Sequence, residues 1–138
     1  MEGENLEIKI NGSGDIKATG QVTLTDKMTF ENDGSGDMKF EDLVADDFNA
    51  EIQGSGNLQV NDGATTDLDV KLRGSGDIKL YDLQSTDCKV DSDGSGDIQI
   101  RVSDVLDVEI SGSGDVKYKG NPTISISDSG SGDLINAN

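Results

Sequence analysis

The tripeptide Gly-Ser-Gly occurs seven times at nearly regular spacing along this chain. Its copies begin at residues 12, 34, 54, 74, 94, 112 and 130, and an aspartate follows every copy except the third, where Asn57 stands instead. Successive copies are 18 to 22 residues apart. A repeat of this length is typical of solenoid proteins, in which each repeat forms one coil and packs on its neighbours.

Apolar residues occupy fixed offsets from each copy. The column four residues before the first glycine contains Ile8, Phe30, Ala50, Val70, Val90, Val108 and Ile126. The column four residues after it contains Ile16, Met38, Leu58, Ile78, Ile98, Val116 and Leu134. Polar residues mostly separate the columns, and this alternation predicts strands buried on one face. No segment has the i, i+3, i+4, i+7 apolar pattern, so we predict no helix.

Two architectures fit strands joined by sharp corners: an antiparallel hairpin array and a parallel solenoid. Hairpins would need regular tight turns at both ends, whereas the second linker of each repeat varies in length. Columns that keep their residue type favour stacking of equivalent residues. We therefore predict an all-β fold, a single right-handed parallel β-helix or solenoid of about six to seven coils with roughly 20 residues per coil. It forms one domain over residues 1–138, about 30 Å long.

The composition fits a thin core and limits the classes of partner. Only 32% of the residues are hydrophobic, and the formal net charge is −17. That charge would repel nucleic acid and anionic membranes, but it permits cations, basic proteins and neutral glycans. No stretch approaches the roughly 20 apolar residues of a membrane span, and the first ten residues lack the pattern of a signal peptide. Cys88 stands in an apolar column, which predicts a small buried side chain.

The repeated Gly-Ser-Gly-Asp motif has three interpretations: a phosphate loop, a calcium site or a structural corner. Phosphate loops lead into a helix, whereas here each copy leads into a strand. Calcium-binding β-rolls carry related turns at nine-residue intervals, a shorter period than this one. The aspartates of the motif in this chain nevertheless suggest a carboxylate ladder, and a cation would relieve the repulsion between them. The candidate calcium ligands are Asp15, Asp37, Asp77, Asp97, Asp115 and Asp133.

The structural corner is the favoured interpretation. Glycine adopts positive φ without a Cβ penalty, which suits a sharp bend, and Ser13 and its equivalents would hydrogen-bond along the stack. Two residues beyond four of the aspartates stand Lys17, Lys39, Lys79 and Lys117. We expect this lysine column to neutralise the aspartate column in part, at a few tenths of a kcal/mol per exposed pair.

Catalysis has little support in the sequence. The chain contains no histidine, so no Ser-His-Asp or Cys-His arrangement can form. Carboxylate pairs occur everywhere on so acidic a chain, which makes any one pair uninformative. Some polysaccharide-degrading enzymes are β-helices, but their clefts are built by long loop insertions that are absent here. We predict a protein that is not an enzyme, with no catalytic residue and no cofactor apart from the open question of calcium.

The segment SGSGDVKYKGNPTISISDSGSGDL at residues 111–134 resembles the head GIN domain family of auto-transporter adhesins from Bacteroidetes-type bacteria. Tyr118, Gly120, Asn121 and Pro122 are its most specific part, and the resemblance extends over nearly the whole chain. It implies a right-handed β-helix, export, and attachment at the cell surface, outer membrane or periplasm. It brings no catalytic or ligand residues.

The leading hypothesis is a non-enzymatic cell-surface or secreted module that acts as an adhesin or scaffold. A calcium- or carbohydrate-binding β-helix is the alternative, followed by a polysaccharide-active enzyme. The expected partners are an extracellular glycan or protein. Because the N-terminal coil has no capping helix, we also expect an end-to-end homodimer through that edge.

Overall fold

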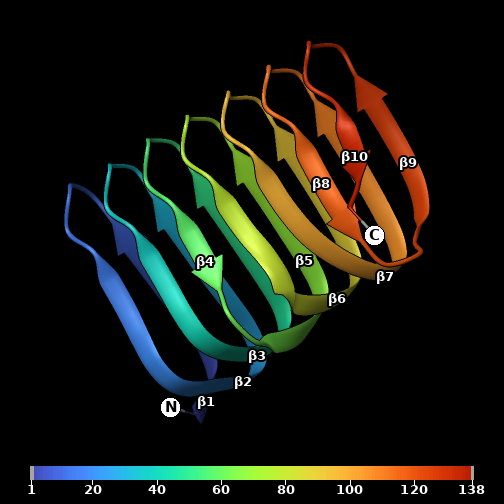
Figure 1. Cartoon of the computed structure of the whole chain (residues 1–138). Coiled ribbons are helices and arrows are strands. Elements are labelled where there is room, and N and C mark those ends of the chain that lie inside the picture. Colours follow the sequence, from blue (N-terminus) through green and yellow to red (C-terminus); the bar gives the residue numbers. More distant parts are fainter. Residues whose placement is uncertain (1, 138) are drawn as a thin grey trace.

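The computed structural model describes residues 2–137 and contains ten β-strands in one continuous sheet, in which every strand pair is parallel (Figure 1). The strands are β1 (Glu2–Ile10), β2 (Ile16–Asn32), β3 (Met38–Ile52), β4 (Leu58–Val60), β5 (Gly63–Leu72), β6 (Ile78–Ser92), β7 (Ile98–Ile110), β8 (Val116–Lys119), β9 (Thr123–Asp128) and β10 (Leu134–Asn136). The described residues form no helix. The chain is a β-solenoid of about seven turns, as the repeat predicted.

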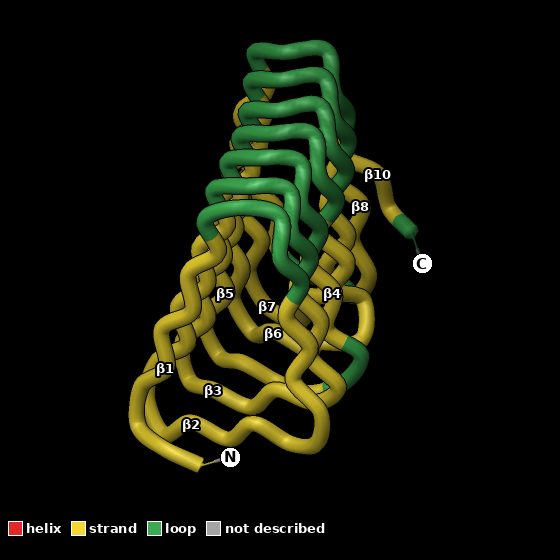
Figure 2. The backbone as a smooth tube through the Cα atoms, turned by 90° about the vertical axis from the view of Figure 1, so that its left-hand side faces the viewer, coloured by secondary structure: helices red, strands yellow, loops and turns green. Residues whose placement is uncertain are grey.

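Equivalent residues of successive repeats lie directly above one another. Phe30 of β2 is in register with Ala50 of β3, which is in register with Val70 of β5. The Gly-Ser-Gly corners stack in the same way and form one row of loops along an edge of the solenoid (Figure 2). The predicted columns are therefore confirmed.

The core is a single apolar layer enclosed by the coils. Three phenylalanines of β2 and β3, Phe30, Phe40 and Phe48, are fully buried, and the rings of Phe40 and Phe48 meet edge-to-face at 6.4 Å. Each such side chain contributes about 1.5–3 kcal/mol when it leaves water. The apolar residues of the variable linkers are buried as well, including Leu43 and Leu83. The linkers thus close the core opposite the corners.

The corner glycines are required for a different reason from the one that the sequence suggested. Among them, only Gly12 has φ in the left-handed region, at 140°. From the second coil onward, a Cβ on either glycine would collide with the carbonyl oxygen of the equivalent glycine in the preceding coil. The carbonyl below Gly34, that of Gly12, also accepts the backbone N–H of Ser35 at 2.9 Å. Glycine is needed because the coils approach so closely here, and the positive-φ explanation was wrong for all but the first corner.

Candidate functional site

The aspartates of the motif form one column, and each side chain bonds to the next coil. In every step the Oδ1 atom accepts the backbone N–H of the following Asp or Asn. The distances are 2.9 Å for Asp15 to Asp37, 2.9 Å for Asp37 to Asn57, 2.8 Å for Asn57 to Asp77, 3.0 Å for Asp77 to Asp97, 3.2 Å for Asp97 to Asp115 and 3.0 Å for Asp115 to Asp133. The side chains therefore continue the hydrogen-bond ladder around the corner.

This ladder explains which residue types the column accepts. An acceptor oxygen is what the bond requires, so Asn57 serves as well as the aspartates around it. The bond occupies one oxygen of each carboxylate that has a coil above it. Within residues 2–137, no group of three or more Cys, Asp or Glu side chains is arranged to hold a metal ion. The geometry gives these aspartates a structural role, and calcium binding by the column stays a prediction.

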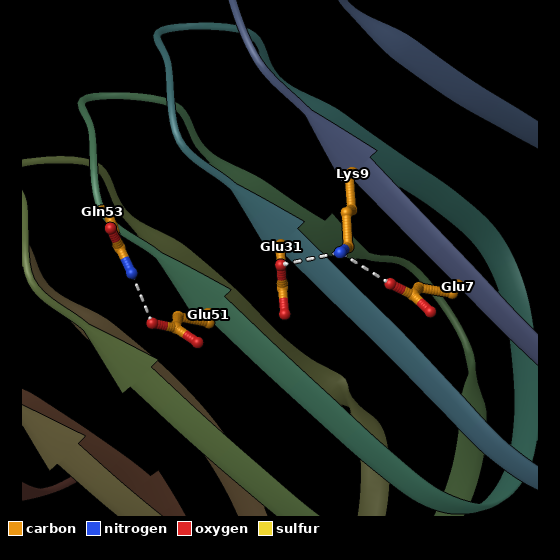
Figure 3. A network of polar contacts seen from close by, with 5 residues as sticks. All are labelled: Glu7, Lys9, Glu31, Glu51 and Gln53. Carbon is orange, nitrogen blue, oxygen red and sulfur yellow. Dashed lines mark hydrogen bonds and ion pairs between the residues drawn. The ribbon is translucent and has the colours of Figure 1, made fainter.

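The lysine column does not pair with the aspartate column. In the described part of the chain, the ion pairs are those of Lys9 with Glu7 at 3.0 Å and with Glu31 at 3.8 Å (Figure 3). The hydrogen bond to Glu7 and the two carboxylate charges raise the pKa of Lys9. The serine hydroxyls of the corners likewise form no hydrogen bond within this range. The backbone amides of five of these serines donate instead to a glycine carbonyl of the preceding coil: Ser35, Ser75, Ser95, Ser113 and Ser131. The described residues thus show neither the lysine–aspartate pairs nor the serine hydrogen bonds that the sequence suggested.

Cys88 lies in the core, as its column predicted. It is 3% exposed, and its register neighbours are Leu68 and Leu106. Burial raises the pKa of the thiol, and the charge of Asp69 raises it further. A thiol that stays protonated is a poor nucleophile, so Cys88 serves as packing.

A second acidic column, which the sequence analysis did not identify, lies on β3, β5 and β6. Asp47, Asp67 and Asp87 are in register, with Lys27 of β2 next in line. The pKa of Asp67 is raised, first by desolvation and then by the hydrogen bond with Asp47 and the charges of its neighbours. The column borders a shallow hollow of about 470 Å³.

An open groove of about 690 Å³ is built from five equivalent triplets. The triplets are residues 44–46, 64–66, 84–86, 101–103 and 119–121, one from each of five successive coils. They lie midway between successive corners in the sequence, on the opposite side of the coils from the corner row (Figure 2). The groove therefore runs along the solenoid axis.

Each triplet places two outward-facing side chains on either side of a central one. One wall is the register column Val44, Ala64, Gln84, Arg101 and Lys119. The other wall contains Asp46, Thr66, Thr86, Ser103 and Asn121. Between the walls, the buried hydroxyl of Thr65 donates to the carbonyl of Asp46 at 3.1 Å, and that of Ser85 donates to the carbonyl of Arg101 at 2.6 Å. These bonds hold the floor in place.

Sequence reasoning missed this groove because the triplets fall in the variable linkers. The register shifts between Leu80 and Gln84 when β6 pairs with β7, so counting from the corners does not align Gln84 with Arg101. A signal was nevertheless present. Thr65-Thr66 and Ser85-Thr86 are short polar pairs that recur 20 residues apart within otherwise alternating strands.

The fold is shared with solved structures of proteins from Parabacteroides species. A putative adhesin from Parabacteroides distasonis superposes with a TM-score of 0.93 at 27% identity, over 99% of this chain and 57% of that chain. A putative adhesin from Parabacteroides merdae gives 0.92 at 25% identity, over 100% and 57%. A protein from P. distasonis described as a putative lipid binding protein gives 0.89 at 32% identity, over 99% and 56%. This chain thus spans little more than half the length of each.

A comparison with curated proteins finds no match. The family model described as "Putative auto-transporter adhesin, head GIN domain" matches residues 1–62 and again residues 61–122. Two consecutive matches reflect the internal repeat and together extend over most of the chain. On this evidence, the chain belongs to the head GIN domain family of auto-transporter adhesins.

Proposed function

We propose that this chain is a non-enzymatic module of an exported adhesin, exposed at the cell surface, which binds its partner along the groove of the five triplets. The observation that carries the proposal is the groove itself: five successive coils contribute equivalent residues to one continuous exposed surface. Repeat proteins use such extended surfaces for binding. The family description and the adhesin-type neighbours support the same function.

The lining of the groove favours a glycan or a polar protein surface over a lipid. One structural neighbour is described as lipid binding, but here Val44 is the largest apolar side chain on an outward wall. An acyl chain needs apolar area for its burial, whereas threonine, serine, glutamine and asparagine offer hydrogen bonds. No helix of the described residues is long and apolar enough to cross a membrane.

The proposed function is tested by location and by attachment. We expect an epitope-tagged full-length protein to be cleaved when protease is added to intact cells of the host that encodes it. We also expect beads coated with the 138-residue chain to attach to glycan-coated surfaces more than beads coated with an unrelated β-protein of similar net charge. Protection from protease until the cells are lysed would contradict surface exposure. Equal attachment of the two bead types would contradict adhesion.

A further inference from the structure

We propose that the groove binds a linear uronic-acid polysaccharide, with Arg101 and Lys119 holding sugar carboxylates and the opposite wall binding sugar hydroxyls. The inference rests on the proposed adhesin function and names its ligand class. Three features of the groove carry it: an unpaired cationic end, a wall of short polar side chains, and a repeat along the axis that suits a linear polymer.

The cationic end is exceptional on a chain with a net charge of −17. Arg101 of β7 and Lys119 of β8 are register partners on adjacent coils, and both are partly buried. Neither forms an ion pair in the described part of the chain, where the ion pairs belong to Lys9. Tyr81 steadies the Lys119 ammonium, which lies 4.6 Å from the centre of its ring. A guanidinium beside an ammonium is a suitable receptor for a carboxylate.

The opposite wall supplies neutral hydrogen-bonding groups. Thr66 and Thr86 line the groove, and their hydroxyls form no hydrogen bond within the described residues. Beneath them, Thr65 and Ser85 are bonded to backbone carbonyls, so the surface is held in shape before a ligand arrives. Such preorganisation lowers the cost of binding. Groups of this kind match the hydroxyls of a sugar chain.

The groove has the repeat of a linear polymer. Each coil adds about 4.8 Å along the axis, so five coils present equivalent side chains over roughly 20 Å. This spacing between coils is close to the length of one pyranose residue in an extended polysaccharide. The charge is also polarised, because Asp46 lies at the opposite end from Arg101 and Lys119. We therefore place the sugar carboxylates at the end formed by β7 and β8.

The test is calorimetric titration of the chain with oligomers of galacturonate, alginate and hyaluronan, with dextran oligomers of the same length as the neutral control. We expect at least one uronate oligomer to bind saturably and dextran to bind far more weakly. Arg101→Gln combined with Lys119→Gln should weaken uronate binding by about 10- to 100-fold. Thr66→Val combined with Thr86→Val should weaken it several-fold without changing its salt dependence.

A matched control separates the groove from the overall charge. Lys71→Gln with Lys89→Gln changes the net charge equally but lies outside the groove, and it should leave uronate affinity unchanged. The inference is overturned if no uronate oligomer binds. It is also overturned if the Lys71/Lys89 control loses as much uronate affinity as the Arg101/Lys119 variant. If the coated beads still attach to glycan surfaces in that case, the adhesin function survives and only the ligand is wrong. If the chain binds uronate oligomers but the tagged protein stays inside the cell, the ligand class is right and the adhesin function is wrong.

Discussion

At the scale of single residues, the aspartate column shows how one side chain completes the backbone ladder. Asp77 accepts the amide of Asp97 at 3.0 Å, while its own amide donates to Asn57 at 2.8 Å. At the corner, the acceptor for the amide of the next coil is thus a side-chain oxygen. The motif is therefore defined by an acceptor at its fourth position, not by a negative charge.

This role distinguishes two substitutions at Asp77. Asp77→Ala removes the acceptor and should lower the free energy of unfolding by about 1–3 kcal/mol, because the Asp97 amide loses its partner. Asp77→Asn keeps the acceptor and removes a charge from an acidic column, so stability should be unchanged or higher. Urea unfolding of both variants measures the difference. Equal losses would show that the charge matters, and a calcium-dependent rise in melting temperature that Asp77→Asn abolishes would assign the column to calcium.

The sequence predicted the position of these residues better than their chemistry. Periodicity placed Asp15 and its equivalents in one column, because a parallel stack repeats whatever the chain repeats. It did not reveal the acceptor role, since hydrogen bonds between coils depend on how far the backbone turns at the corner. For the same reason, the sequence suggested that Gly34 is needed for a positive φ. In the structure, the carbonyl of Gly12 is what excludes a side chain at this position.

At the scale of strands, the segment of β3, β5 and β6 that carries Asp47, Asp67 and Asp87 should respond to pH. The folded-state pKa of Asp67 is raised above 3.8, so the folded chain binds this proton more tightly than the unfolded chain. The unfolding free energy must then fall as pH rises through the interval between the unfolded and folded pKa values. Asp67 therefore favours folding more at pH values below this interval than above it.

We expect Asp67→Asn to raise the melting temperature at pH 7 and to lessen its fall as the pH rises above 3.8. The variant removes the charge that the folded state disfavours. Asp26→Asn, an exposed aspartate of β2 outside the column, is the control with the same change in net charge. Thermal unfolding followed by circular dichroism at several pH values measures both. If the two variants shift the melting temperature alike, the effect belongs to the total charge and not to the column.

Strands and linkers differ in how well the sequence predicted them. Most segments next to a corner alternate apolar and polar residues, so the bounds of these strands follow from their distance to the corner. The linkers lack this regular pattern. In one of them, Gly63 occupies the register position that Leu43 and Leu83 hold in the neighbouring coils, with φ at 131°. Both the groove and the second acidic column lie toward these linkers, so the surfaces that matter for binding are the ones that periodicity alone could not place.

At the scale of the whole molecule, the solenoid follows from repetition but its ends do not. The apolar columns run the length of the chain, and each inner coil covers the next. At the ends this cover is lost: Ile16 is 37% exposed, whereas Met38 in the same column is 1% exposed. At the other end Ile126 is 49% exposed. Such ends expose both apolar side chains and the unpaired backbone groups of an edge strand.

We expect two copies of the 138-residue chain to associate through the N-terminal coil. There β1 is an edge strand, and nothing lies within 4 Å of where a Cβ on Gly14 would stand, so the corner offers flat backbone to a partner. Ile16→Lys should shift the chain from dimer to monomer in sedimentation equilibrium, because a charge would be buried at the contact. Ile126→Lys should leave the dimer intact. A chain that stays monomeric at high concentration would exclude association, and equal effects of the two variants would indicate an open head-to-tail stack, since only that arrangement uses both ends.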